Sequence, residues 1–173
     1  MRAARIRPAT EADLKDLERL GLEVQGEHAA ALPGIFRAGV SPLAGEYVIE
    51  LLRSDTAAVL VAERDDHALV GCVVVKLRHA PEYAVFEPRC FAVVDLLAVA
   101  STARRTGIGR LLMKGAALWA TQHGAASLEL SVWDFNREAI AFYAAVGMET
   151  ARRTMTLPLN GSSPSIDSDV TPD

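Results

Sequence analysis

A short basic turn that contains two glycines constrains this sequence most. The turn reads Arg104-Arg105-Thr106-Gly107-Ile108-Gly109-Arg110. An apolar run at residues 91–99, broken only by Asp95, precedes it, and apolar residues recur at helical spacing after it as far as Gly124. The pattern predicts a buried strand, a glycine-containing turn and a helix. Such a turn directs backbone N–H groups and the positive end of a helix dipole at one point, which suits a phosphate group.

The composition indicates one globular domain with a tail. The chain has 173 residues, of which 50% are hydrophobic, so it is long enough to bury a core without disulfides or metals. Its net charge of −4 arises largely from aspartates near the C-terminus, and no basic surplus indicates a nucleic-acid partner. Residues 160–173 are mostly Ser, Asp, Pro and Gly. We therefore expect a domain at residues 1–159 and a disordered tail at 160–173.

The cysteines and the apolar runs indicate the cellular compartment of the protein. Cys72 and Cys90 lack the short spacing of a zinc site or a disulfide scaffold, so we expect no metal and two reduced thiols, with pairing across neighbouring strands as the second option. No apolar run is long enough to cross a bilayer, and residues 1–8 do not form a secretory signal. The expectation is a cytoplasmic protein without a membrane partner. The high apolar content leaves a homodimer open.

Hydrophobic periodicity and turn residues predict a mixed α/β domain. Strands are predicted at residues 4–7, 57–63, 69–77, 91–99, 127–132 and 150–157, and helices from Glu11, Ser41, Ile108 and Asn136. Residues 26–40 contain a proline and glycines and are predicted to be irregular or made of short helical turns. Residues 79–89 are predicted to form a long loop that covers part of a site.

Two enzyme interpretations compete with a plain connecting turn. In a dinucleotide-binding fold, Gly107 and Gly109 would begin the glycine fingerprint, and Glu129 lies 20 residues after Gly109. However, Leu112 occupies the position of the third glycine, and seven residues separate Val99 from Gly107, more than that tight turn allows. The dinucleotide interpretation is therefore disfavoured.

The second interpretation rests on two patterns in the expected order. Leu97-Ala98-Val99, followed by Arg104-x-x-Gly107-x-Gly109 and a helix, resembles the acetyl-CoA-binding motif of the GCN5-related N-acetyltransferase (GNAT) family. Asn136-x-x-Ala139-x-x-Phe142-Tyr143-x-x-x-Gly147-Met148 resembles the second motif of that family. The resemblance covers residues 5–159. It implies a mixed, mostly antiparallel central sheet flanked by helices, the acyl-CoA N-acyltransferase (GNAT) fold, and acetyl-CoA as the co-substrate.

The resemblance also implies a role for each cofactor-binding residue. Backbone groups of Leu97 and Val99 would bind the amides of the pantetheine arm, and one amide would polarise the acetyl carbonyl. The amides from Arg105 to Arg110 would hold the diphosphate, with arginine side chains adding charge-assisted contacts. Asn136 would help to hold the cofactor arm or would only cap a helix. The predicted cofactor-binding residues are Leu97, Ala98, Val99, Arg104, Arg105, Thr106, Gly107, Ile108, Gly109, Arg110, Asn136 and Tyr143.

Two residues are candidates for proton transfer. Tyr143 occupies the position of the family's usual general acid, where it would protonate the departing thiolate; alternatively, it is an aromatic residue of the core. Asp95 interrupts an apolar strand and, counting by two, shares a face with Leu97 and Val99. It is either a base for the acceptor ammonium, aided by burial, or a structural carboxylate. The resemblance also implies that His28, Phe36 and Tyr83, and more weakly Phe86, contact the acceptor in its pocket.

The sequence therefore predicts an enzyme that transfers an acetyl group from acetyl-CoA to a primary amine of a small molecule. Direct attack within a ternary complex is expected, because neither motif contains a cysteine that could carry the acetyl group. Two alternatives stay open: an acetyltransferase that modifies protein N-termini or lysines, and a catalytically silent module that binds acyl-CoA.

Overall fold

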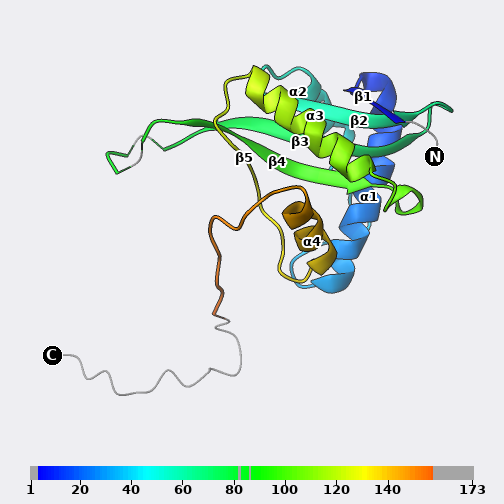
Figure 1. The fold of residues 1–173 in the computed structure, drawn as a ribbon. Helices are drawn as coiled ribbons and strands as arrows, with labels where there is room; N and C mark the ends of the chain where they lie inside the picture. Colours follow the sequence, from blue (N-terminus) through cyan, green and yellow to red (C-terminus); the bar gives the residue numbers. More distant parts are fainter. Residues whose placement is uncertain (1–3, 82, 86, 158–173) are drawn as a thin grey trace. The chain divides into compact units, whose positions relative to one another are not determined.

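The computed structural model describes residues 4–81, 83–85 and 87–157. The chain divides into two compact units, Met1–Arg137 and Glu138–Asp173. The first unit contains the sheet and most helices (Figure 1). The predicted tail at residues 160–173 and the weak contact residue Phe86 lie outside the described residues, and the predicted domain boundary at residue 159 stays a prediction.

The first unit is built on a five-stranded sheet in the order β1-β2-β3-β4-β5. Neighbouring strands from β1 to β4 pair antiparallel, whereas β5 runs parallel to β4. This mixed, mostly antiparallel sheet confirms the predicted fold class. The strands are β1 (Ala4–Pro8), β2 (Ala57–Arg64), β3 (Leu69–His79), β4 (Cys90–Val99) and β5 (Leu128–Leu130).

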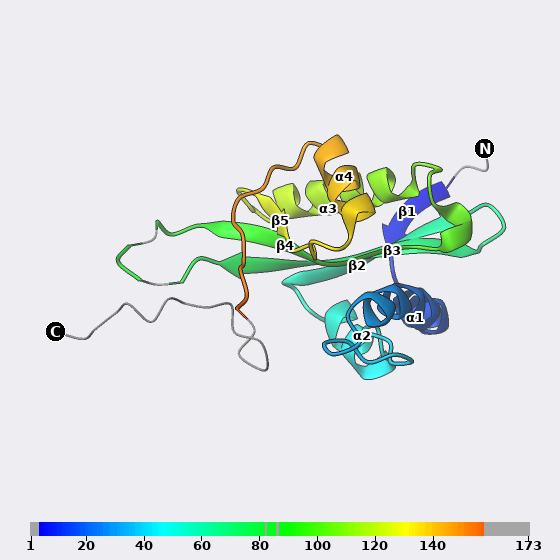
Figure 2. The same ribbon diagram turned by 90° about the horizontal axis from the view of Figure 1, so that it is seen from below.

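Helices cover both faces of the sheet (Figure 2). The helices α1 (Leu14–Ala31) and α2 (Gly45–Leu52) lie on one face, and α3 (Ile108–Gln122) lies on the other. Short 3-10 turns, η1 (Glu11–Asp13) and η2 (Ser101–Ala103), precede α1 and follow β4. Because both faces are covered, most of β2 and β3 is buried, as their unbroken apolar runs require.

A glycine in β3 lets α3 approach the sheet closely. A Cβ at Gly71 would lie 2.8 Å from the carbonyl oxygen of Ala98 and 3.0 Å from Cδ1 of Leu112. Leu112 is fully buried, and Gly71 pairs with Val99, the last residue of β4. The first turns of α3 are therefore packed against the C-terminal end of β4.

A β-bulge interrupts the pairing of β4 with β3. The register passes from Val75 opposite Val94 to Val74 opposite Leu96, so Asp95 is an extra residue on β4. A bulge of this kind changes which edge the following backbone groups face.

Two helix boundaries differ from the sequence prediction. The helix α1 continues to Ala31, into the stretch predicted to be irregular, because a single glycine at Gly26 does not end a helix that continues through alanines. It stops at Leu32, the residue before a proline, where the helical conformation is disfavoured. The helix α2 begins at Gly45 rather than at Ser41, because the Ser41 hydroxyl donates to the Glu18 carbonyl in α1 at 3.0 Å.

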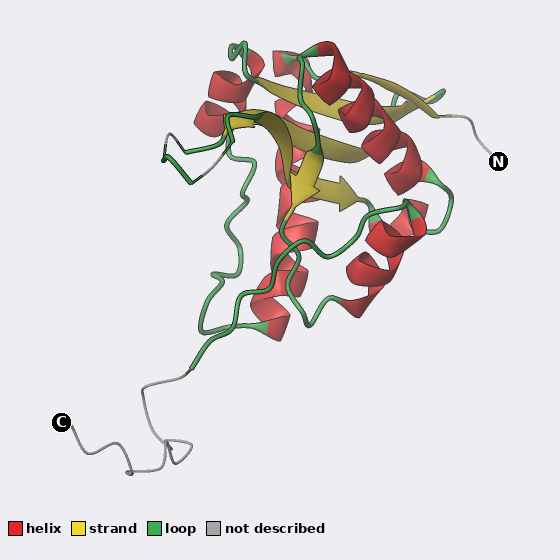
Figure 3. Cartoon of the chain, turned by 60° about the vertical axis from the view of Figure 1, so that its left-hand side comes forward, coloured by secondary structure: helices red, strands yellow, loops and turns green. Residues whose placement is uncertain are grey.

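The second unit contains most of α4 (Arg137–Ala145), which ends in a Schellman motif. Gly147 has a φ of 94°, its N–H donates to Ala144, and the Met148 N–H donates to the Tyr143 carbonyl at 3.0 Å. The predicted strand at residues 150–157 is wrong, since this segment is a loop (Figure 3). The described residues of this unit contain no strand with which the segment could pair, and a single strand is not stable alone.

Candidate active site

The strand β4 runs beyond the end of its neighbour β5. Their pairing stops where Val94 lies opposite Leu130, and β4 continues to Val99. In the described part of the chain, residues 95–99 have no strand partner on this edge. The two strands therefore leave a backbone edge available for an extended ligand.

The bulge determines which residues face this open edge. Before the bulge, the Ala92 N–H donates at 2.9 Å to the carbonyl of Ser127, on the β5 side. After it, the Ala100 N–H donates at 2.9 Å to the Val70 carbonyl, on the β3 side. Because backbone direction alternates along a strand, Ala98 also faces β3, and Leu97 and Val99 face the open edge. From the resemblance to the GNAT family, the backbone groups of these two residues were predicted to bind the pantetheine arm.

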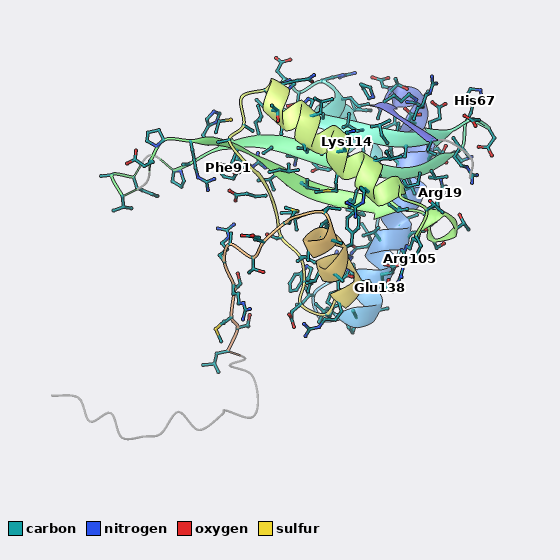
Figure 4. The ribbon with its side chains drawn as sticks, in the orientation of Figure 1. Arg19, His67, Phe91, Arg105, Lys114 and Glu138 are labelled. Atoms are coloured by element: carbon teal, nitrogen blue, oxygen red, sulfur yellow. The ribbon has the colours of Figure 1, made fainter. Side chains whose placement is uncertain are left out.

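The basic turn leads from the end of β4 into α3. Arg105 and Gly107 both have left-handed backbone conformations, with φ values of 62° and 91°, and the Thr106 hydroxyl donates to the Ala103 carbonyl at 2.6 Å. Figure 4 labels Arg105 at this turn. Nothing lies within 4 Å of the point where a Cβ of Gly107 would be.

The start of α3 has the features of an anion site. Gly107 is its N-cap and no side chain caps it, and its first turn contains no acidic residue. The first bond within the helix is donated by Leu111 to Gly107, so the helix itself leaves the N–H groups of Ile108 and Gly109 without acceptors. Backbone donors and the helix dipole thus coincide, as a diphosphate requires.

Arg104 braces the turn through two contacts within the protein, and its predicted cofactor contact stays a prediction. Its Nη2 forms an ion pair with Glu27 of α1, and its Nε donates to the Val99 carbonyl at 3.3 Å. Glu23, one helical turn earlier in α1, accepts from the Ser101 N–H at 3.0 Å. Two carboxylates of α1 therefore fix the start of the turn.

Asp95 has a partner that the sequence analysis did not identify. Its carboxylate forms an ion pair with Lys76 of β3, and the Lys76 ammonium also donates to the Tyr47 hydroxyl at 2.8 Å. Burial lowers the pKa of Lys76, but its hydrogen bonds to Asp95 and Tyr47 outweigh this and leave the pKa raised. Lys76 therefore stays cationic near neutral pH and compensates the charge of Asp95.

Two expectations about Asp95 are corrected. It is exposed rather than buried, with 28% of its side chain accessible. It also does not share a face with Leu97: it bonds to Lys76, whereas Leu97 lies opposite Val73, on the other face of β3. Counting by two fails because the bulge at Asp95 adds one residue.

Four aromatic rings from three segments meet near the end of α1. His28 contacts Phe36 and Phe135 at ring centroid distances of 5.0 and 5.6 Å, and Phe36 contacts Trp133 at 5.4 Å. The structure thus brings together His28 and Phe36, which were both predicted for the acceptor pocket. Sequence reasoning missed Trp133 and Phe135, whose signal was two aromatic residues closely following the β5 pattern. We call these four residues the aromatic cluster.

Tyr83 does not belong to the aromatic cluster. It is 67% exposed in the loop between β3 and β4, which closes at the pair His79 and Cys90, at the opposite end of β4 from Val99. The described parts of this loop extend away from the sheet in Figures 1 and 2. The expectation that residues 79–89 cover the site is therefore wrong, because the hairpin points the loop outward.

Tyr143 lies in α4 of the second unit. Its ring contacts Phe142 at a centroid distance of 5.3 Å, and burial raises the pKa of its hydroxyl. A phenol with a raised pKa stays protonated at neutral pH, as a proton donor must. Asn136 immediately precedes α4, in the position of a helix cap, and its N–H donates to the Trp133 carbonyl at 2.9 Å.

An open strand edge on the strand that leads into an anion site suits an extended ligand that ends in a diphosphate, as acyl-CoA does. A family model described as the acetyltransferase (GNAT) family matches residues 18–148. The chain belongs to this family and is an acetyl-CoA-dependent N-acetyltransferase.

Solved structures share the fold over nearly the whole chain. A variant of the BH1408 protein from Bacillus halodurans is 30% identical with a TM-score of 0.86, and the match covers 90% of this chain and 99% of that one. The aminoglycoside 6'-N-acetyltransferase AAC(6')-Ih from Acinetobacter baumannii is 17% identical with a TM-score of 0.70, covering 92% and 100%. AAC(6')-Iy in complex with CoA is 17% identical with a TM-score of 0.71, covering 93% and 97%.

Among curated proteins, no sequence matches the chain. Within the described residues, every helix is too short or too polar to pass through a bilayer.

Proposed function

We propose that the chain transfers the acetyl group of acetyl-CoA to a primary amine of a small molecule. The observation that carries the proposal is the open edge of β4, where Leu97 and Val99 face outward on the strand that leads through the basic turn to the anion site at α3. An extended pantetheine arm can pair with such an edge while its diphosphate binds the helix N-terminus. The distant structural neighbours described as aminoglycoside N-acetyltransferases support a small-molecule acceptor.

In the proposed reaction, the amine attacks the thioester carbonyl directly. A backbone N–H at the open edge stabilises the oxyanion, because it is fixed where negative charge develops. The carbonyl then re-forms as the carbon–sulfur bond breaks, and Tyr143 donates its proton to the departing thiolate. The nitrogen gives up one proton to solvent, and solvent returns a proton to the Tyr143 phenolate. The products are an N-acetylated amine and CoA.

Direct transfer is favoured over a covalent acetyl-cysteine. Burial raises the pKa of the Cys72 thiol to about 12, so Cys72 is a thiol rather than a nucleophilic thiolate. Cys90 lies at the start of β4, five residues before the extra residue of the bulge. Among the described residues, no other cysteine is present.

For Asp95, the ion pair with Lys76 favours the structural interpretation over the base. The Lys76 ammonium already compensates the charge of this carboxylate, and the ion pair gives it a structural role. The amine then binds as the free base or loses its proton to another acceptor.

The experiment measures CoA release from acetyl-CoA in the presence of amines, polyamines, amino acids, aminoglycosides and peptides. Acetylation of a small amine, with at least a 100-fold lower kcat after Tyr143→Phe, supports the proposal. Cofactor binding without turnover of any acceptor would instead identify a silent acyl-CoA-binding module, and turnover of peptides alone would identify a protein acetyltransferase.

A further inference from the structure

Two of the segments that carry the aromatic cluster are connected to elements at the open edge of β4. The helix α1, which carries His28, is fixed to the turn after β4 through Glu23 and Glu27. Trp133 and Phe135 follow β5 directly, where that strand stops pairing with β4 at Leu130. The segments that flank the open edge are thus joined through these rings.

The cluster offers aromatic surface and one polar acceptor. Trp133 and Phe135 are 44% and 37% exposed. The Nδ1 atom of His28 lies 2.9 Å from the Val24 carbonyl, which can only accept, so Nδ1 carries the hydrogen. In this tautomer the lone pair is on Nε2. Ring faces attract an ammonium group through cation–π interactions, and a lone pair accepts one of its N–H bonds.

Among the described residues, the two carboxylates next to cluster residues in the chain are paired: Glu27 bonds to Arg104, and Asp134 bonds to Arg137 at 2.9 Å. Asp95 of β4 is paired too, since it bonds to Lys76. Glu23 accepts from Ser101 and from Arg19. Binding of a polycation is strengthened by several carboxylates that lack a cationic partner. This surface instead offers ring faces and carboxylates that are already paired with cations.

We propose that the aromatic cluster binds the body of the acceptor, and that the acceptor is a monoamine carried on an aromatic or aliphatic group. This inference rests on the proposed function and narrows it, because it disfavours the polyamine and aminoglycoside classes. Phe36 and Trp133 contribute the ring faces that hold the apolar body, and they determine specificity without taking part in bond making.

The test compares kcat/KM for 2-phenylethylamine and tryptamine with that for spermidine and kanamycin. The monoamines are expected to exceed the polycations at least tenfold. Phe36→Ala and Trp133→Ala should each raise KM for 2-phenylethylamine about tenfold, the effect of one lost ring contact of about 1–2 kcal/mol. The affinity for acetyl-CoA and kcat at saturating amine should change little.

Trp119→Ala is the matched control, since Trp119 stacks on His123 near the end of α3, at a ring distance of 4.2 Å. It should leave KM for the amine unchanged. Trp133→Phe keeps a ring and should retain most of the affinity, which separates a lost contact from misfolding. Intrinsic fluorescence titration with 2-phenylethylamine gives a reading that does not depend on turnover.

Preference for kanamycin or spermidine, or equal effects of Trp133→Ala and Trp119→Ala, would overturn the inference while leaving the proposed function intact. Failure of every amine to release CoA, although acetyl-CoA binds, would instead remove the proposed function and this inference with it.

Discussion

Replacing Gly107 with glutamate tests the anion site directly. Gly107 has a φ of 91°, and a Cβ there would enter open space with nothing within 4 Å. The fold therefore accommodates the volume of the side chain, and the only structural cost is backbone strain. A non-glycine residue in a left-handed conformation costs roughly 1–2 kcal/mol.

The effect on binding is larger because the new carboxylate lies beside the proposed diphosphate. Two unit charges 4 Å apart repel by about 1 kcal/mol in water and by about 4 kcal/mol at an effective dielectric constant of 20. Gly107 is exposed, so values near the lower end apply. Repulsion by two phosphate charges then gives about 2–4 kcal/mol, which weakens CoA binding about 30- to 700-fold.

Calorimetric titration with CoA measures the affinity, and thermal unfolding measures the strain. Gly107→Ala and Gly107→Gln are matched controls: all three variants carry the backbone strain, and the glutamine has the size of glutamate without its charge. The difference between the Glu and Gln variants should shrink in 1 M salt, because screening shortens the range of the repulsion. Equal CoA affinity of the wild-type protein and the Glu variant would refute a diphosphate site at this turn.

The remaining predictions concern three carboxyl or phenol groups. Tyr143→Phe should lower kcat and remove the alkaline limb of the pH–rate profile; in the wild type this limb lies above the ordinary phenol pKa, because burial raises the pKa of Tyr143. Asp95→Asn should leave the shape of the pH–rate profile unchanged. It should lower the free energy of unfolding in urea by about 1 kcal/mol or less, since the ion pair with Lys76 is partly exposed. A rate loss that becomes smaller as pH rises would instead show that Asp95 is a general base. Glu63 hydrogen-bonds Arg7, His67 and Arg5, in that order of effect, and these lower its pKa to about 2. The stability that ionised Glu63 contributes is thus complete above its unfolded-state pKa and is lost as pH falls from about 4.5 to 2. Glu63→Gln should therefore make the free energy of unfolding depend less on pH in this window. An unchanged pH dependence would contradict the low pKa of Glu63.

The local parts of the site could be predicted from the sequence. An apolar strand, a glycine-rich turn and an amphipathic helix each depend on residues close together in the chain, and β4, Gly107 and α3 lie where the pattern predicts. The mixed sheet was also predictable, because the strands from β1 to β4 each carry a clear pattern.

Features that depend on distant partners could not be predicted in this way. The partner of Asp95 is Lys76, on a different strand, and nothing in the apolar run at residues 91–99 identifies it. His28 and Phe135 meet although more than a hundred residues separate them. The strand predicted at residues 150–157 failed for the same reason, since an alternating pattern does not establish that a partner strand is present.

The bulge shows how one such long-range feature affects the whole site. Without the extra residue at Asp95, the alternation that begins at Ala92 would direct Leu96 and Ala98 to the open edge, and Leu97 and Val99 toward β3. With it, the last outward-facing backbone group, at Val99, lies immediately before the turn that leads to Gly107. The same extra residue places a carboxylate where Lys76 can bind it, so the ion pair stabilises the bulge from one face while the backbone edge stays open to the cofactor. An acidic residue in this apolar strand is thus explained by the backbone it supports, and proton transfer need not be invoked for its presence.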